Sequence, residues 1–225
     1  MWLGTIVARQ TGKVEGADGS LIPTKPGLWF GAAQRLIEAQ SGIEEIEAAT
    51  DRVNYETGFV RFVESIEECW TSFFDEGKEN FTDFQPWAGK YQKLRNEDEL
   101  LRYIYQARHK SQHGRYQLDW GPATIQIAPG YNGNIRDLKI FENGSFEVDA
   151  HPSSDKHANK VQIKQNYGDP KLPAIENRGV MFHPPTVHLG EELADCSPLN
   201  ITKCASDFYT SALMNALEKF SLGAT

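Results

Sequence analysis

Cysteines are few in this sequence, and long apolar runs are missing. The 225 residues include three cysteines, Cys69, Cys196 and Cys204, whose spacing fits no metal site and whose odd number fits no closed set of disulfides. They are typical of reduced thiols, as found in the cytoplasm. The opening residues MWLGTIVARQ have no basic start and only a short apolar run, so they predict neither a signal peptide nor a membrane span. We expect a cytoplasmic protein with no membrane partner.

A phosphate-binding loop and an excess of positive charge are also missing. Glycines are frequent in residues 1–29, but no Gly-Lys-Ser/Thr sequence completes a Walker motif there, so this segment is predicted to be a loop-rich lead-in. Lys and Arg number 23 against 31 Asp and Glu, a formal net charge of −8. Because nucleic acids attract proteins largely through positive charge, any RNA site must be local. We expect no cofactor.

Apolar residues recur at helical spacing in the first half of the chain. One helix is predicted from Phe30 to about Thr57, and a clearer one from about Phe59 to Asp75. A series of aromatic residues continues beyond it and fits either a base-stacking platform of a single-strand binder or a helical core. The core is favoured because much of the series lies at helical spacing. Its members are Trp70, Phe73, Phe74, Phe81, Phe84, Trp87 and Tyr91.

The stretch NEDELLRYIYQARHKSQHG, residues 96–114, predicts a further helix that ends in an arginine-containing face. Asn96 with Glu99 three residues later fits a helix N-cap, and Gly114 fits the end of the helix. An apolar face within it leads to Arg108, which keeps its charge and therefore needs a carboxylate, a phosphate, another subunit or water. His113 lies ~140° around an unbroken helix from Arg108, so the two converge only if the helix ends first.

Two interpretations of the end of this helix remain open. Arg108, His109, Lys110 and His113 are cations of a kind that favours the negative end of a helix dipole, and this alone explains their position. The same residues, with Arg102 and Arg115, also form the densest basic run of the chain, which leaves a local RNA site open.

The sequence RHKSQH, residues 108–113, resembles the signature of HEPN proteins, an Arg followed after four to six positions by a His. The preceding WAGKYQKLRNEDELLRYIYQA resembles the third helix of that fold. The resemblance implies a bundle of four or five helices, often dimeric, and in many members metal-independent ribonuclease activity. It further implies that His113 moves a proton and that Arg108 stabilises charge on phosphorus. His109, where the family most often has Asn, becomes a second donor or holds the loop.

After residue 114 the pattern changes to the alternation of strands with one polar face. Strands are predicted at 124–127, 135–141, 145–148 and 160–165, and Asn143-Gly144 is typical of a hairpin turn. We expect a small antiparallel meander. The loop HPSSDKH, residues 151–157, could hold a metal through His151, Asp155 and His157, but such loops are more often simply solvated, and we assign no metal.

Helical spacing returns from about Ile201 to Leu222, in a helix expected to pack back on the N-terminal helices. The predicted fold class is α+β: a helical bundle of three N-terminal helices plus the C-terminal helix, with an inserted antiparallel β meander. The domain organisation follows as a lead-in at 1–29, a HEPN-like bundle at 30–114, the β segment at 115–200 and the C-terminal helix at 201–225.

Two functions fit this sequence. The favoured one is a HEPN-like binding or interaction module without catalysis, in which Arg108 pairs with an acidic residue of a neighbouring helix and His113 caps the structure. The alternative is a metal-independent endoribonuclease that uses Arg108 and His113, with His109 as a tentative third residue, at a dimer interface. The expected partners are a second copy of the chain and, as a further candidate, RNA.

Overall fold

The computed structural model describes residues 13–15, 21–23, 28–113, 116–121, 124–127, 133–140, 146–152, 163–166 and 168–221. Two units share these residues: Met1–Leu118 with Lys171–Thr225 in unit 1, and Asp119–Pro170 in unit 2. The described part of unit 1 has five helices: α2 (Phe30–Ala48), α3 (Arg52–Asn80), α4 (Phe84–Glu97), α5 (Glu99–Gln112) and α6 (Pro198–Ser221). In the lead-in, β1 (Lys13–Glu15) and β2 (Leu21–Pro23) form an antiparallel pair.

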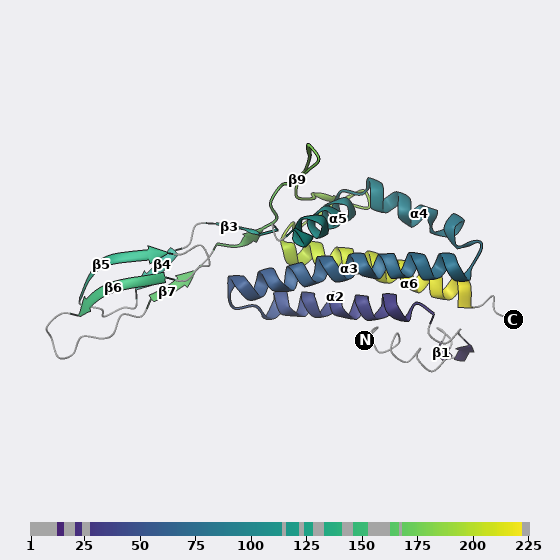
Figure 1. Cartoon of the computed structure of the whole chain (residues 1–225), viewed down its shortest axis with the longest axis horizontal. Helices are drawn as coiled ribbons and strands as arrows, with labels where there is room; N and C mark the ends of the chain where they lie inside the picture. Colours follow the sequence, from purple (N-terminus) through teal and green to yellow (C-terminus); the bar gives the residue numbers. More distant parts are fainter. Residues whose placement is uncertain are drawn as a thin grey trace. The chain divides into compact units, whose positions relative to one another are not determined.

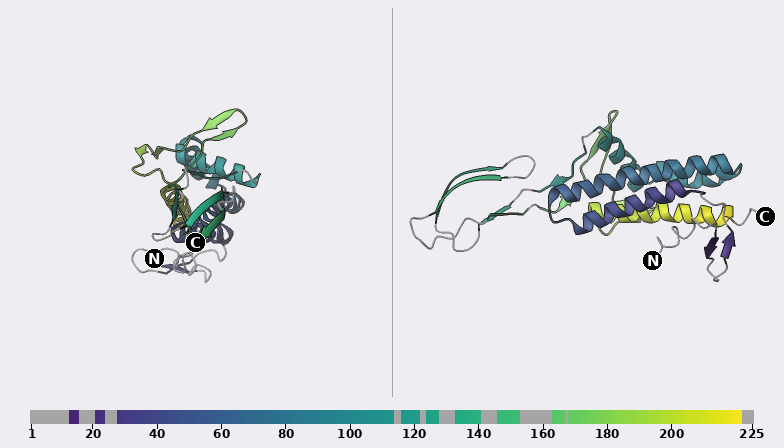
Figure 2. Two further views of the ribbon diagram at one scale, coloured as in Figure 1. Left: turned by 90° about the vertical axis from the view of Figure 1, so that its left-hand side faces the viewer. Right: turned by 60° about the horizontal axis from the view of Figure 1, so that its bottom comes forward.

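The predicted fold class, a helical bundle with inserted antiparallel strands, is confirmed (Figure 1). Helices α2 and α3 lie side by side along most of their lengths, and α6 packs against both of them (Figure 2). Helices α4 and α5 follow α3 and also pack against it. The C-terminal helix therefore packs back on the N-terminal helices, as the sequence predicted.

Two glycines allow α2 and α3 to approach closely. A Cβ added to Gly42 would lie 2.7 Å from the carbonyl oxygen of Gly58 and 2.9 Å from the backbone nitrogen of Phe62. A Cβ added to Gly58 would in turn lie 2.8 Å from the carbonyl oxygen of Gly42. Because real Cβ atoms do not come this close, a larger residue at either position would force the two helices apart.

An aromatic core fills the bundle at the end where α3 leads into α4. Trp29, just before α2, is 1% exposed, and its indole nitrogen donates to the carbonyl oxygen of Phe73 at 3.0 Å. Its ring contacts those of Phe73, Phe84 and Phe220. Of the predicted aromatic series, Trp70, Phe73, Phe84 and Tyr91 are buried. For these residues the core interpretation is confirmed.

Two predicted helix boundaries are wrong, because the observed boundaries are set by aspartates that cap the helices. Asp51 caps α3, where its side chain accepts from Asn54 N at 2.8 Å, so the helix expected to run to Thr57 ends at Ala48 and a new one begins. Asn96 lies inside α4 rather than at a cap. The cap of α5 is Asp98, which accepts from Leu101 N at 3.0 Å while its own N–H bonds to Leu94 O. The predicted third helix is thus two helices joined at Asp98.

In unit 2 the strands pair in a nested order. The inner pair is β5 (Gly133–Ile140) with β6 (Phe146–Pro152), and the outer pair is β4 (Thr124–Ile127) with β7 (Ile163–Asn166); both are antiparallel (Figure 1). The short β3 (Asp119–Trp120) pairs with β8 (Pro170–Lys171). His151 lies in β6, whereas Asp155 and His157 of the HPSSDKH loop lie outside the described residues.

The residues after 171 belong to unit 1, although the sequence grouped them with the β segment. They form the hairpin of β9 (Ile175–Asn177) and β10 (Val180–Phe182), followed by the pair β11 (Val187–His188) and β12 (Glu191–Glu192). Ile175 is 1% exposed, and both β9 and β11 pack against α5. This returning segment therefore supplies a wall beside the helix that carries the predicted site.

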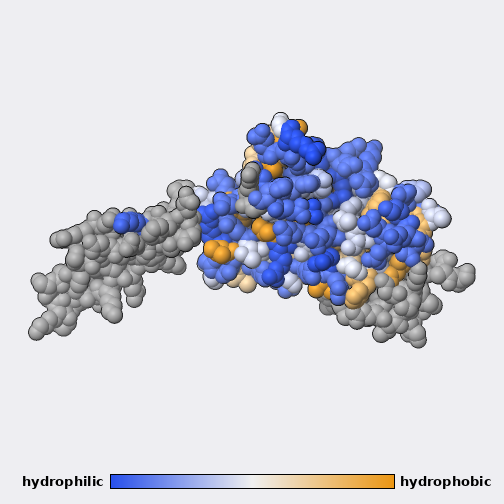
Figure 3. Space-filling model, viewed as in Figure 1, coloured by the Kyte–Doolittle hydropathy of each residue, from blue (hydrophilic) through white to orange (hydrophobic). Residues whose placement is uncertain are grey.

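The face of unit 1 seen in Figure 3 is mostly hydrophilic, with scattered apolar residues. None of the helices in the described ranges combines the length and apolar character needed to cross a bilayer.

Candidate functional site: the outer face of α5

Helix α5 has two faces of opposite character. Its inner face carries Leu101, Ile104 and Ala107, each 0% exposed. Its outer face carries polar residues at steps of three and four, the spacing that puts side chains in one row. We call this row the α5 stripe: Arg102, Tyr105, Gln106, His109, Lys110 and His113, of which Gln106 is 9% exposed and the others are more accessible.

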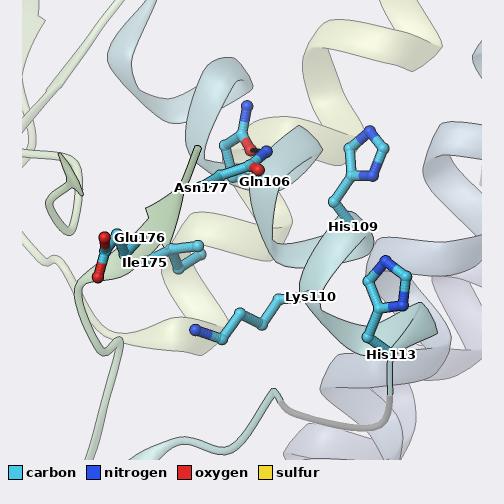
Figure 4. Close-up of a pocket in the computed structure, with 7 residues that line it drawn as sticks. All are labelled: Gln106, His109, Lys110, His113, Ile175, Glu176 and Asn177. Atoms are coloured by element: carbon cyan, nitrogen blue, oxygen red, sulfur yellow. Dashed lines mark hydrogen bonds between the residues drawn. The ribbon is translucent and has the colours of Figure 1, made fainter. Parts of the chain in front are cut away.

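One end of the α5 stripe forms a cavity with strand β9. The cavity has a volume of about 170 Å³ and is called here the histidine pocket. Figure 4 shows His109 and His113 on the same side of α5, with Lys110 extended on the other side towards β9. Its lining residues are Gln106, His109, Lys110 and His113 from the helix and Ile175, Glu176 and Asn177 from the strand.

Hydrogen bonds hold two walls of the histidine pocket. His109 Nε2 lies 2.9 Å from the hydroxyl of Tyr105, and the two rings meet edge to face at 4.8 Å. Across the pocket, Asn177 Nδ2 donates to Gln106 Oε1 at 2.7 Å. The side chains of Lys110 and His113, in contrast, have no hydrogen bond or ion pair with any other residue that the structure describes. The pocket therefore combines fixed walls with two polar groups that are free to meet a ligand.

Arg108 lies apart from this pocket. It continues the row of Leu101 and Ile104, is partly buried, and is not among the lining residues. Helix α5 is regular to Gln112, and His113 follows it with φ −94° and ψ 10°, so Arg108 and His113 keep their separation of about 140° around the axis. The structure thus brings His109 and His113 to one cavity and leaves Arg108 on another face.

The acidic partner that the sequence suggested for Arg108 is not found in the described part of the chain, where Arg108 makes no ion pair. A buried pair exists instead between Arg95 of α4 and Glu67 of α3. Tyr209 of α6 joins it: Arg95 Nε donates to the Tyr209 hydroxyl at 2.9 Å, and that hydroxyl donates to Glu67 Oε1 at 2.8 Å. Burial, followed by the Glu67 charge, raises the pKa of Tyr209 well above its usual value, so Tyr209 remains a donor.

A second cluster fixes the start of α5. The carboxylate of Asp98 accepts from the backbone N–H of Leu189 at 2.6 Å and from His188 Nδ1 at 3.0 Å, in addition to capping the helix. Burial acts to raise the pKa of Asp98, but the bonds from His188, Leu189 and Leu101 outweigh it and hold the pKa below its usual value. This clamp ties the returning segment to the N-terminus of α5, which keeps the wall of the pocket in place.

Several residues of the site were not singled out from the sequence. The α5 stripe was detectable, because Tyr105 and Gln106 continue the three- and four-residue spacing of Arg102, His109 and His113. The wall residues Glu176 and Asn177 carried no such signal, since only the folding of β9 onto α5 brings them there.

Apart from the carboxylate of Glu176, the polar side chains of the histidine pocket suit an anionic ligand. A lysine ammonium and imidazole and amide N–H groups donate hydrogen bonds, which phosphate oxygens accept. Within the described ranges, no cluster of three or more His, Cys, Asp or Glu residues is arranged to hold a metal ion. In comparisons with known proteins, no family model matches the chain, and neither a curated protein nor a solved structure is significantly similar to it.

Proposed function

We propose that this chain is a HEPN-like binding module that takes RNA along the α5 stripe. The observation that carries the proposal is that Lys110 and His113 line one pocket without a partner among the described residues. Polar groups without a partner among the described residues are available to a ligand, and a lysine that lines the same pocket as two imidazoles is suited to phosphate. The site is local, as a net charge of −8 requires. In this proposal the protein acts in the cytoplasm as a homodimer.

The position of Arg108 favours binding over catalysis. The chemistry implied by the HEPN resemblance needs an arginine and a histidine at the same phosphate. Within one copy of the chain, Arg108 and His113 lie on different faces of α5 and only His113 reaches the pocket. A single copy therefore binds the phosphate backbone but lacks the arginine at the reacting centre.

A second candidate function, metal-independent RNA cleavage, is favoured by one observation. His109, Lys110 and His113 line the same cavity. One imidazole could take the proton from a ribose 2′-hydroxyl as its oxygen attacks phosphorus, and the other could give a proton to the departing 5′-oxygen. The lysine ammonium would stabilise the extra negative charge on phosphorus. A second copy facing the first could also bring Arg108 to this centre.

Binding is tested by fluorescence anisotropy with a labelled single-stranded oligoribonucleotide over a series of salt concentrations. Lys110→Ala should weaken binding and lower the salt slope by about one. Lys203→Ala is the matched control, because Lys203 is an exposed lysine on α6 whose partner is Glu47, outside the pocket. Absence of binding by the wild-type protein, or equal losses in the two variants, would contradict the proposal.

Cleavage is tested with the same RNA in the presence of a chelator, with the products resolved on a gel. If the second candidate is right, His109→Ala and His113→Ala each abolish cleavage while the protein stays folded, and Lys203→Ala cleaves as the wild type does. Cleavage at the wild-type rate by either histidine variant would exclude it. Light scattering on the same samples measures whether the chain is the proposed dimer.

A further inference from the structure

A second cavity lies at the other end of the α5 stripe. It has a volume of about 320 Å³, within the range of small-molecule sites, and is called here the arginine pocket. None of the described residues that line it is acidic. The lining residues are Gln92, Arg95 and Asn96 from α4, Arg102, Tyr105 and Gln106 from α5, and Phe182 from β10.

Arg102 is the available charge of this pocket. Its guanidinium carbon lies 5.4 Å from the centre of the Phe182 ring, and the residue is exposed. It makes no ion pair with any residue in the described part of the chain. Arg95, the other arginine of the pocket, is neutralised by Glu67. The pocket therefore presents one uncompensated positive charge next to an aromatic ring.

The remaining lining groups match a nucleobase. Phe182 and Tyr105 offer aromatic rings, on which bases stack, and the Arg102 guanidinium over Phe182 offers a second flat surface. Gln92, Asn96 and Gln106 are amides, each of which can both donate and accept hydrogen bonds at the edge of a base. A site that bound only a phosphate would not need the aromatic rings of Phe182 and Tyr105.

The two pockets are adjacent along the helix. Gln106 lines both, and the bond between Tyr105 and His109 joins the arginine pocket to the histidine pocket. From Arg102 to His113 the helix rises roughly 16 Å, which equals the length of about five stacked nucleotides at about 3.4 Å each. A strand lying along the α5 stripe therefore meets both pockets.

We propose that the arginine pocket holds an unpaired base of single-stranded RNA, stacked on Phe182, while a phosphate of the same strand lies in the histidine pocket. This inference rests on the proposed RNA binding and adds its substrate class. A base in a duplex is stacked and paired, so it cannot enter the pocket. The chain should prefer single strands to a duplex of the same sequence.

The test compares variants of the full chain in the anisotropy assay, with the single-stranded oligoribonucleotide and its duplex as probes. Phe182→Leu keeps an apolar side chain but removes the ring, and should weaken single-strand binding about 5- to 100-fold, the usual effect of losing one stacked base. Val180→Ala is the control on the same strand, since Val180 is 51% exposed and lines neither pocket. Phe182→Tyr should restore binding.

Arg102→Gln should also weaken single-strand binding, whereas Arg35→Gln should not, because Arg35 is an exposed arginine of α2 that pairs with Glu38 and Glu68. Melting temperatures confirm that each variant is folded. If the wild type binds RNA but Phe182→Leu and Arg102→Gln bind as their controls do, the base pocket is refuted and the proposed function stands. Equal binding of single strand and duplex by the wild type also refutes the base pocket. If the wild type binds no RNA, both proposals fall.

Discussion

The Glu67–Arg95–Tyr209 network and the α5 stripe differ in whether their polar side chains have partners within the protein. In the network every charged group has a partner from another helix, and the Arg95 and Glu67 side chains are 10% and 6% exposed. In the stripe, the side chains of Arg102, Lys110 and His113 have neither a hydrogen bond nor an ion pair with another described residue. The charges of the network are paired with one another inside the fold, whereas the charges of the α5 stripe remain available to a ligand.

This difference separates residues that stabilise the protein from residues that are available to bind a ligand. A buried ion pair is costly to break, because removing one partner leaves the other charge without water or a counter-charge. An exposed cation without an internal partner contributes little to stability and can be removed without unfolding the protein. The two regions should therefore respond in opposite ways to substitution.

The largest effect is expected when the buried network is broken. Glu67→Gln should lower the free energy of unfolding by about 3–5 kcal/mol, because Arg95 is left as a buried charge. For a chain of this length that corresponds to a fall in Tm of roughly 6–20 °C. Glu38→Gln, which breaks the exposed Arg35–Glu38 pair, is the control and should cost less than about 1 kcal/mol. Equal effects in the two variants, measured by denaturant unfolding, would show that the network is not structural.

An intermediate effect is expected at Asp98, which ties the His188–Leu189 segment to the start of α5. Asp98→Ala removes the cap of α5 and should cost about 1 kcal/mol, or roughly 2–4 °C in Tm. Asp98→Asn keeps a capping oxygen but removes the charge. Because the pKa of Asp98 is lower in the folded protein than in the unfolded chain, its charge stabilises the fold above about pH 4. That contribution is lost as the pH falls through the folded pKa.

The Tm difference between wild type and Asp98→Asn should accordingly be largest at neutral pH and shrink in acid. Thermal unfolding followed by circular dichroism between pH 7 and pH 2 measures it. A difference that stays constant over this range would mean that the charge of Asp98 does not stabilise the clamp.

The smallest effect on stability is expected at Arg108. Arg108→Ala should change the free energy of unfolding by less than about 1 kcal/mol, because no carboxylate of the described residues loses its counter-charge. Arg95→Ala is the matched comparison and should destabilise the protein several-fold more. A fall in Tm as large as that of Arg95→Ala would place Arg108 among the structural ion pairs.

Local sequence signals account for much of the fold. The strand predicted at 124–127 has the same bounds in the structure, and the aromatic core and the returning C-terminal helix are confirmed. The cap of α5 was misplaced because Asn96 and Asp98 both offer a capping oxygen two residues apart. Asp98 is the cap because its carboxylate also binds the His188–Leu189 segment, about 90 positions along the chain.

The candidate site was only partly predictable, because segments distant in the sequence form part of it. His109 and His113 lie four residues apart on one helix, so their common face follows from helical geometry. The acidic partner predicted for Arg108 is not found among the described residues. The buried ion pair is formed by Arg95 and Glu67 instead, and its network includes a tyrosine 114 positions from Arg95. The signal for that network was Glu67 itself, a carboxylate within the apolar row of α3 that includes Val63 and Trp70.

The sequence by itself determined most of the helical segments, the strands between residues 124 and 166 and which helix faces are apolar, because these depend on spacing along a few turns of chain. Only the tertiary structure decided which charges are neutralised and which remain for a ligand. Pairing of that kind depends on where segments distant in the sequence come to lie, and here the folding of α3, α4 and α6 encloses Arg95 while β9 and β10 leave the α5 stripe open.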